Sequence, residues 1–184
     1  MGIMRNFKMI LGGIGLMLLG TGTFSPAAQY DHEIQDKKMS FAWKVDGDNL
    51  AVKMSAQTEG WVGIGFNPSK MMKDANFILG YVKGGKAEIV DEFGNEDNNH
   101  SLDTKLGGTD NVTLVGGTEE GGTTTIEFIM PLKSSDKNDT EITVDGDTIV
   151  LLAYGGGRDS FKSKHQFRTT LKVNLSTGAS QKVK

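Results

Sequence analysis

The chain has 184 residues, enough for one domain of ordinary size, and its apolar and charged fractions of 37% and 23% are typical of a protein that buries a core. A net charge of −3 gives no indication of a nucleic-acid partner, and we expect none. The absence of cysteine excludes disulfides, thiolate metal sites, iron–sulfur clusters and covalently attached c-type haem.

The N-terminal segment has the layout of a secretory signal. A basic start precedes an uncharged apolar run over residues 9–20, and small residues follow. We expect cleavage after Ala27 or Ala28, so that residues 1–28 are a signal peptide and residues 29–184 form a single exported domain, periplasmic or extracellular. The apolar run is short for a membrane span, and contact with a membrane is expected only if the segment stays uncleaved as an anchor.

Beyond this segment, apolar and polar residues alternate with the period of strands that bury one face. The clearest runs in chain order are MSFAWKV (39–45), NLAVKMSA (49–56), TTTIEFIM (123–130) and RTTLKVNL (168–175). Glycine-containing turns separate the runs, as in DGDN (46–49), KGGK (83–86) and DGDT (145–148). The pattern predicts about nine strands in an all-β fold, an antiparallel β-sandwich with an immunoglobulin-like two-sheet architecture. We interpret the polar segment 94–110 as a surface loop.

Two adjacent methionines interrupt a polar connector. In GWVGIGFNPSKMMKDANFILGYV (60–82), the connector carries Met71 and Met72 where turns usually have polar residues. A flexible methionine often fills a gap at the end of a core, and residue chemistry alone favours this interpretation. A thioether is also a soft ligand, suited to copper(I) or, opposite a histidine, to haem iron. No spacing rule joins the methionines to any of the three histidines, which are His32, His100 and His165.

The stretch 60–82 resembles the DOMON family of β-sandwich domains, which includes the cytochrome domain of cellobiose dehydrogenase. The family motif is a Gly-Trp-x-Gly-x-Gly-Phe strand, a loop with methionine, and a small–acidic pair that opens the next apolar strand. Asn76 stands where the family usually has Asp, and the other matching positions are Gly60, Trp61, Gly63, Gly65, Phe66, Met72 and Ala75. Later strands, among them AEIVDEFG (87–94) and IVLLAYGGG (149–157), extend the similarity over residues 35–175.

The resemblance implies a cofactor and a function. In haem-binding members of the family, a methionine of this loop and a histidine before the last strand are the axial ligands of a non-covalent b-type haem. The matching metal ligands here are Met72 and His165, with Met71 as an alternative because a one-residue alignment slip exchanges the methionines. Some relatives use lysine in place of histidine, and Lys164 adjoins His165. The implied function is that of an exported b-type cytochrome domain that exchanges electrons with a redox partner protein or domain.

Residues near the two ligand loops are the expected surroundings of the haem. We expect apolar contacts from six aromatic side chains, which are Phe66, Phe77, Tyr81, Tyr154, Phe161 and Phe167. Four basic residues lie close to His165 in the sequence, namely Arg158, Lys162, Lys164 and Arg168. Arginine and lysine commonly pair with carboxylates such as haem propionates, and a solvated basic loop is the equal alternative.

Two other functions compete with electron transfer. A β-sandwich can bind carbohydrate through exposed aromatic side chains, but Trp43 and Trp61 alternate with strand neighbours, which favours their burial. The domain can also serve as an interaction module without a cofactor. We do not expect an enzyme, because neither a nucleophile elbow nor a paired-carboxylate motif stands out.

Overall fold

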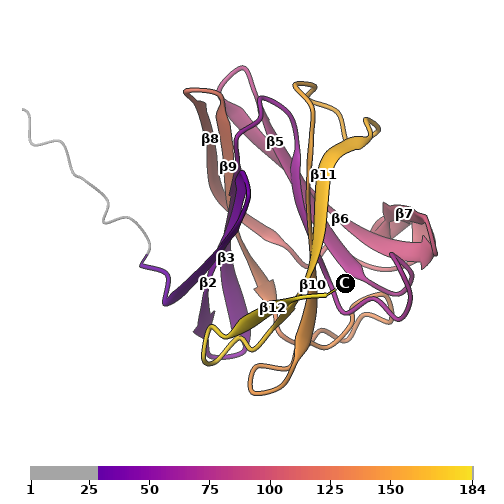
Figure 1. Ribbon diagram of the computed structural model, residues 1–184. Coiled ribbons are helices and arrows are strands. Elements are labelled where there is room, and N and C mark those ends of the chain that lie inside the picture. Colours follow the sequence, from indigo (N-terminus) through magenta and orange to yellow (C-terminus); the bar gives the residue numbers. More distant parts are fainter. Residues whose placement is uncertain (1–28, 184) are drawn as a thin grey trace, which may run out of the picture.

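The computed structural model describes residues 29–183, which fold into two antiparallel sheets that face each other (Figure 1). The five-stranded sheet has the order β1 (His32–Asp36), β2 (Met39–Asp46), β3 (Asn49–Ala56), β9 (Thr123–Pro131) and β8 (Thr113–Glu120). The seven-stranded sheet has the order β12 (Ser180–Lys182), β11 (His165–Val173), β10 (Thr148–Gly155), β4 (Val62–Phe66), β5 (Asn76–Lys83), β6 (Lys86–Glu96) and β7 (Asn99–Leu102). This arrangement confirms the predicted all-β antiparallel sandwich.

The predicted signal peptide lies outside the described residues. Within residues 29–183, no helix is long and apolar enough to cross a membrane. The cleavage site and the exported location therefore stay predictions.

The main core lies between the two sheets and is built by the predicted alternation. In β2 and β3, every second side chain points inward, and Phe41, Trp43, Leu50 and Val52 are fully buried. The rings of Phe41 and Trp43 stack with centroids 4.6 Å apart. The Trp43 indole N–H donates to the carbonyl oxygen of Leu175 over 2.9 Å. Burial of one large apolar side chain stabilises a fold by about 1.5–3 kcal/mol, so these inward faces decide how the sheets pack.

A smaller apolar cluster covers the outer face of the seven-stranded sheet. Alternation sends Ile64 of β4 into the main core and leaves Phe77 and Leu79 of β5 outside, with Trp61 beside them. Gly65 lies beneath Phe77, because a Cβ atom at position 65 would overlap the phenyl ring. Strand β4 is therefore buried on both faces, which explains the glycines in its sequence.

The interpretation of residues 94–110 as a surface loop is wrong in part. Strand β6 continues to Glu96, β7 follows, and a short 3₁₀ helix, η1, spans Asp103–Leu106. The Asp103 side chain is buried, with the residue only 1% exposed. The segment is ordered because β7 pairs with the edge of β6. A polar strand of this kind has no alternation of apolar and polar residues, so the sequence does not reveal it.

Candidate functional site

A hollow lies on the outer face of the seven-stranded sheet, over β10 and β5. Its volume is about 440 Å³, within the range of small-molecule and cofactor sites. Phe77, Leu151 and Ala153 line it with apolar surface, and Met72 and His165 line it as well. The same five residues also line an adjoining hollow of about 50 Å³, together with Trp61, Gly63, Ile64, Leu79 and His100. Two candidate ligands that are 93 positions apart in the sequence thus face one apolar space.

The loop that carries Met72 is fixed to β6 by backbone hydrogen bonds. The Met72 N–H donates to the carbonyl oxygen of Asp97 over 3.1 Å. Gly94 accepts from the N–H of Asp74 over 2.7 Å and donates to the carbonyl oxygen of Ala75 over 2.9 Å. A Cβ atom at Gly94 would overlap the Met72 carbonyl oxygen, so only glycine permits this close approach.

The two adjacent methionines differ in exposure and backbone conformation. Met72 is half-buried and packs against the outer apolar cluster. Met71 is 53% exposed and has a left-handed φ of 55°. That conformation costs roughly 1–3 kcal/mol for a residue other than glycine, and the surrounding hydrogen bonds of the loop must hold it in place. Met72 is therefore the less exposed member of the pair, although both residues line the hollow.

A β-bulge turns His165 toward the outer face of the sheet. Phe167 of β11 pairs with Tyr154, and its side chain packs against the main core. In a regular strand, the side chain of residue 165 would also point toward the main core, because it lies two positions before Phe167. A register shift leaves Gln166 without a partner and sets His165 opposite Gly155, on the outer side. The His165 imidazole is exposed, and it forms no hydrogen bond within residues 29–183.

Trp61 connects the histidine loop to the sheet. Its indole N–H donates to the carbonyl and hydroxyl oxygens of Ser163, over 3.1 Å and 2.9 Å, two residues before His165. Its carbonyl oxygen accepts from the N–H of Gly155 over 2.9 Å. At 6% exposure, Trp61 is buried as the sequence predicts, and so is Trp43. The tryptophan of the family motif therefore positions the segment that carries His165.

Of the aromatic residues expected around the haem, Phe77 lines the hollow. Phe66 and Tyr154 face the main core instead, where Tyr154 stacks on Phe167 with ring centroids 5.2 Å apart. In the structure these three side chains therefore pack in or against the main core and do not line the hollow. The period of two accounts for their direction, because Phe66 lies two positions after the inward-facing Ile64.

Of the other expected contacts, only Arg168 lines the hollow. Phe161 packs on Tyr81 with ring centroids 4.6 Å apart. Both residues line a third, neighbouring hollow of about 740 Å³. Arg168 lines the first hollow. The other basic residues are exposed on the preceding loop, and these are Arg158, Lys162 and Lys164. Only part of the basic group therefore faces the candidate site.

His100 belongs to this site, although the sequence gives no sign of it. It lies in β7, its ring centroid is 5.0 Å from that of Phe77, and its Nδ1 pairs with the carboxylate of Glu92. It reaches the smaller hollow beside Met72 and His165. His100 reaches this place because β7 pairs with β6. The segment that forms β7 is polar, so no alternation of apolar and polar residues predicts the strand.

Comparison with known proteins establishes the family. The model of the DOMON domain matches residues 35–155, so the chain belongs to the DOMON family, as the sequence resemblance implied. The chain is 30% identical over 141 residues to DBH-like monooxygenase protein 1 of Mus musculus. It is 26% identical over 164 residues to putative DBH-like monooxygenase protein 2 of Homo sapiens. These alignments cover 75% and 87% of this chain but 22% and 32% of the relatives, so the chain spans a third or less of their length.

The fold resembles that of solved cytochrome domains. The cytochrome b domain of pyranose dehydrogenase from Coprinopsis cinerea aligns with a TM-score of 0.61 at 14% identity, over 76% of this chain and 78% of that one. The cytochrome domain of cellobiose dehydrogenase from Myriococcum thermophilum aligns with a TM-score of 0.54 at 9% identity, over 77% of each chain. At these identities the likeness establishes a shared sandwich fold.

Proposed function

We propose that this DOMON domain binds one non-covalent haem b in the hollow on the outer face of the seven-stranded sheet, with Met72 and His165 as axial ligands, and that it exchanges electrons with a redox partner. One observation carries the proposal: a thioether and an imidazole from distant segments line the same apolar hollow. A methionine sulfur and a histidine nitrogen are a known axial pair for haem iron in cytochromes. The cytochrome domains that share the fold support the same assignment.

The residues around the hollow fit a large, flat and mainly apolar group. Phe77, Leu151 and Ala153 offer apolar contacts, and the exposed His165 imidazole is free to act as a ligand. Arg168 lines the same hollow and offers a guanidinium group to a propionate. A lone copper(I) ion needs soft donors but no apolar walls, so the lining favours haem over copper.

The chain's own residues would determine how the group works. Haem supplies one-electron oxidation and reduction when it is bound. Met72 and His165 would together hold the iron through a sulfur and a nitrogen atom, a pair of ligands that favours electron transfer over oxygen chemistry. The neutral sulfur of Met72 would raise the reduction potential relative to a second histidine. The apolar walls would keep water away from the iron.

The visible spectrum of the full chain, expressed in a host with ample haem, tests the proposal. We expect one haem per chain and the sharp bands of six-coordinate iron after reduction. Acidified organic solvent should extract all of the haem, because the chain has no cysteine to hold it covalently. A folded but colourless protein from such a host would contradict the proposal.

Carbohydrate binding is the second candidate, and the neighbouring hollow favours it. That hollow of about 740 Å³ joins the Tyr81–Phe161 pair to polar side chains, among them Asn99, Ser101 and Asp159. Aromatic faces with polar groups around them suit a sugar ring. A colourless protein that binds oligosaccharides, and loses them in Phe161→Ala, would establish this function in place of haem binding.

A further inference from the structure

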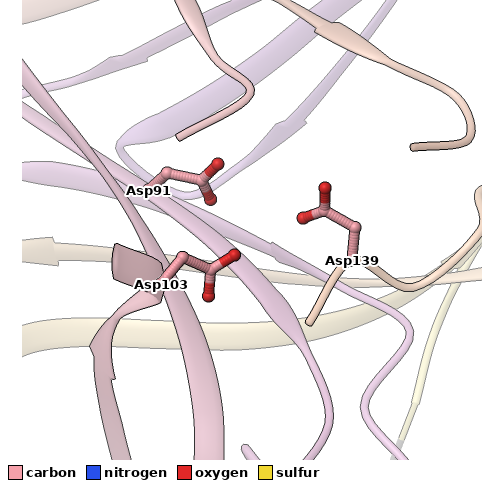
Figure 2. Close-up of side chains that lie close together, drawn as sticks. All are labelled: Asp91, Asp103 and Asp139. Atoms are coloured by element: carbon pink, nitrogen blue, oxygen red, sulfur yellow. The ribbon is translucent and has the colours of Figure 1, made fainter. Parts of the chain in front are cut away.

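Three aspartates meet at one end of the sandwich, on the inner side of the seven-stranded sheet. Asp91 belongs to β6, Asp103 begins η1, and Asp139 lies in the loop between β9 and β10. One carboxylate oxygen from each lies within 4.8 Å of the others. Figure 2 shows the carboxylates turned toward a shared space. Asp91 and Asp103 are only 3% and 1% exposed, so water solvates neither of them well.

The cluster has no positive partner in the part of the chain that the structure describes. No lysine, arginine or histidine of residues 29–183 forms an ion pair with any of the three aspartates. Both carboxylate oxygens of Asp103 and the Oδ1 of Asp91 are buried without a hydrogen-bond partner. Buried charges of one sign are costly unless a counter-charge or a metal ion compensates them.

Asn76 supplies a second and independent observation. It is 3% exposed at the start of β5, and its side-chain amide donates to Asp139 Oδ1 over 2.8 Å. This hydrogen bond places the Asn76 amide at the cluster, and its own Oδ1 is buried without a partner. A buried neutral side chain that contacts Asp139 therefore has an oxygen without a partner, which hydrogen bonding among the carboxylates does not explain.

Asn111 organises the opposite side of the cluster. Its backbone N–H donates to Asp91 Oδ2 over 3.0 Å, and its side-chain amide donates to Asp139 Oδ2 over 2.7 Å. These bonds orient two of the carboxylates through one oxygen each. The Oδ1 of Asp91 and both oxygens of Asp103 remain without hydrogen-bond partners.

We propose that Asp91, Asp103 and Asp139 bind one calcium ion, with Asn76 Oδ1 as a further ligand. The donors are all hard oxygens, and the cluster contains no sulfur or imidazole, which argues against zinc and copper. Calcium accepts carboxylate and amide oxygens in flexible geometry, whereas magnesium keeps most of its water and suits a buried cage less well. Two positive charges would offset most of the three negative charges.

The ion would join segments that are distant in the sequence and would brace the methionine loop. Asn76 follows the Met72 loop directly, and the Thr140 hydroxyl, one residue after Asp139, donates to the Asp74 carbonyl oxygen over 2.6 Å. Calcium at the cluster would therefore hold the end of that loop against the loop that carries Asp139. The site itself does not depend on haem binding.

Calcium titration and thermal unfolding of the full chain, stripped with EGTA, test the proposal. We expect one calcium ion per chain in calorimetry. At about a hundredfold excess over Kd, Tm should rise by roughly 5–10 °C, and magnesium should produce a much smaller change. If EGTA and calcium leave the wild-type Tm unchanged and calorimetry detects no binding, the proposal is overturned and the cluster is a set of protonated carboxyl groups.

Matched variants identify the ligands. Asp103→Asn should weaken calcium binding by roughly tenfold or more, because it removes a ligand charge. It should still fold without calcium, because it also removes an uncompensated buried charge. Asp145→Asn, which makes the same change on an exposed residue of another turn, should leave calcium affinity unaltered. Equal loss of affinity in both variants would indicate a general charge effect and refute the assigned site.

Discussion

At the scale of single residues, the two histidines beside the hollow are held differently. The ring of His100 pairs with Glu92, whereas His165 has no hydrogen bond among the described residues. We predict that His165→Ala loses most of the haem or leaves it high-spin and five-coordinate. His100→Gln should keep a six-coordinate spectrum, because its ring is already engaged. Haem content and visible spectra are measured for both variants. If only His100→Gln loses the six-coordinate spectrum, the histidine ligand is His100 in β7.

The neighbouring methionines allow a similar comparison. Met72 packs on the outer apolar cluster, and Met71 is largely exposed. Met72→Ala should retain haem through His165 but lower the reduction potential, because the sulfur that favours ferrous iron is gone. Met71→Ala should leave the spectrum and the potential almost unchanged. Redox titration separates the cases; if Met71→Ala lowers the potential and Met72→Ala does not, the ligand is Met71.

At the scale of secondary-structure elements, the contact between β6 and the methionine loop depends on Gly94. A Cβ atom there would overlap the Met72 carbonyl oxygen, so Gly94→Ala must displace the loop. We expect the free energy of unfolding to fall by roughly 1–3 kcal/mol, the usual cost of overpacking.

Gly116→Ala is the matched control for this prediction. Gly116 lies in β8, and a Cβ atom there would meet nothing within 4 Å. Its effect on the free energy of unfolding should stay within about 0.5 kcal/mol. Urea unfolding measures both variants, and equal stability would mean that the loop does not rest on β6 in solution.

At the scale of the whole molecule, the acidic cluster should make stability depend on pH. Burial, reinforced by repulsion from Asp139, raises the pKa of Asp91 to about 8 and that of Asp103 to about 7. The other groups that act on the pair are also acidic, namely Asp110, Asp136 and Glu92, and only the Asn111 N–H lowers the pKa of Asp91. Their ordinary pKa is 3.8, so these two carboxyl groups bind more protons in the folded calcium-free protein than in the unfolded chain between pH 4 and 8.

The sign of the pH effect follows from this difference. Without calcium, the contribution of the pair is fully present below pH 4 and is lost as the pH rises toward 8. Calcium replaces the protons, so its effect on Tm should be larger at pH 8 than at pH 5. Thermal unfolding at both pH values, with EGTA or calcium, measures this, and Asp103→Asn should reduce the difference. A larger calcium effect at pH 5 would contradict the prediction.

The charge distribution predicts how partners approach. Removal of the expected signal, with Arg5 and Lys8, changes the net charge from −3 to −5, yet Arg168 lines the hollow and further basic residues precede His165. An anionic small reductant should therefore reduce the haem faster than a cationic one at low salt. That advantage should shrink as salt screens the charges. Stopped-flow measurement of the reduction rates of both reductants over a salt series tests this prediction. If the rates do not depend on salt, the basic residues do not border the haem edge.

Local patterns in the sequence determined the elements and much of their orientation. Alternation in segments such as 39–45 and 49–56 identifies the strands and the side chains that face the core. The same rule would have assigned Phe66 and Tyr154 to the main core, where proximity to the ligand loops suggested otherwise. The family motif around Trp61 supplied Met72 as a candidate ligand, and the wider family resemblance supplied His165. The strands and the motif were predictable because each depends on residues a few positions apart.

Only the tertiary structure decided which distant residues meet. The bulge before Phe167 turns His165 to the face that Met72 reaches, and the β6–β7 pairing brings His100 to the same place. The buried cluster that includes Asp91 and Asp139 likewise arises from separate segments with no common motif. The physical reason is that alternation reports which side of one strand is buried. The order of strands and the path of the loops, which bring these side chains together, are set by how the two sheets pack.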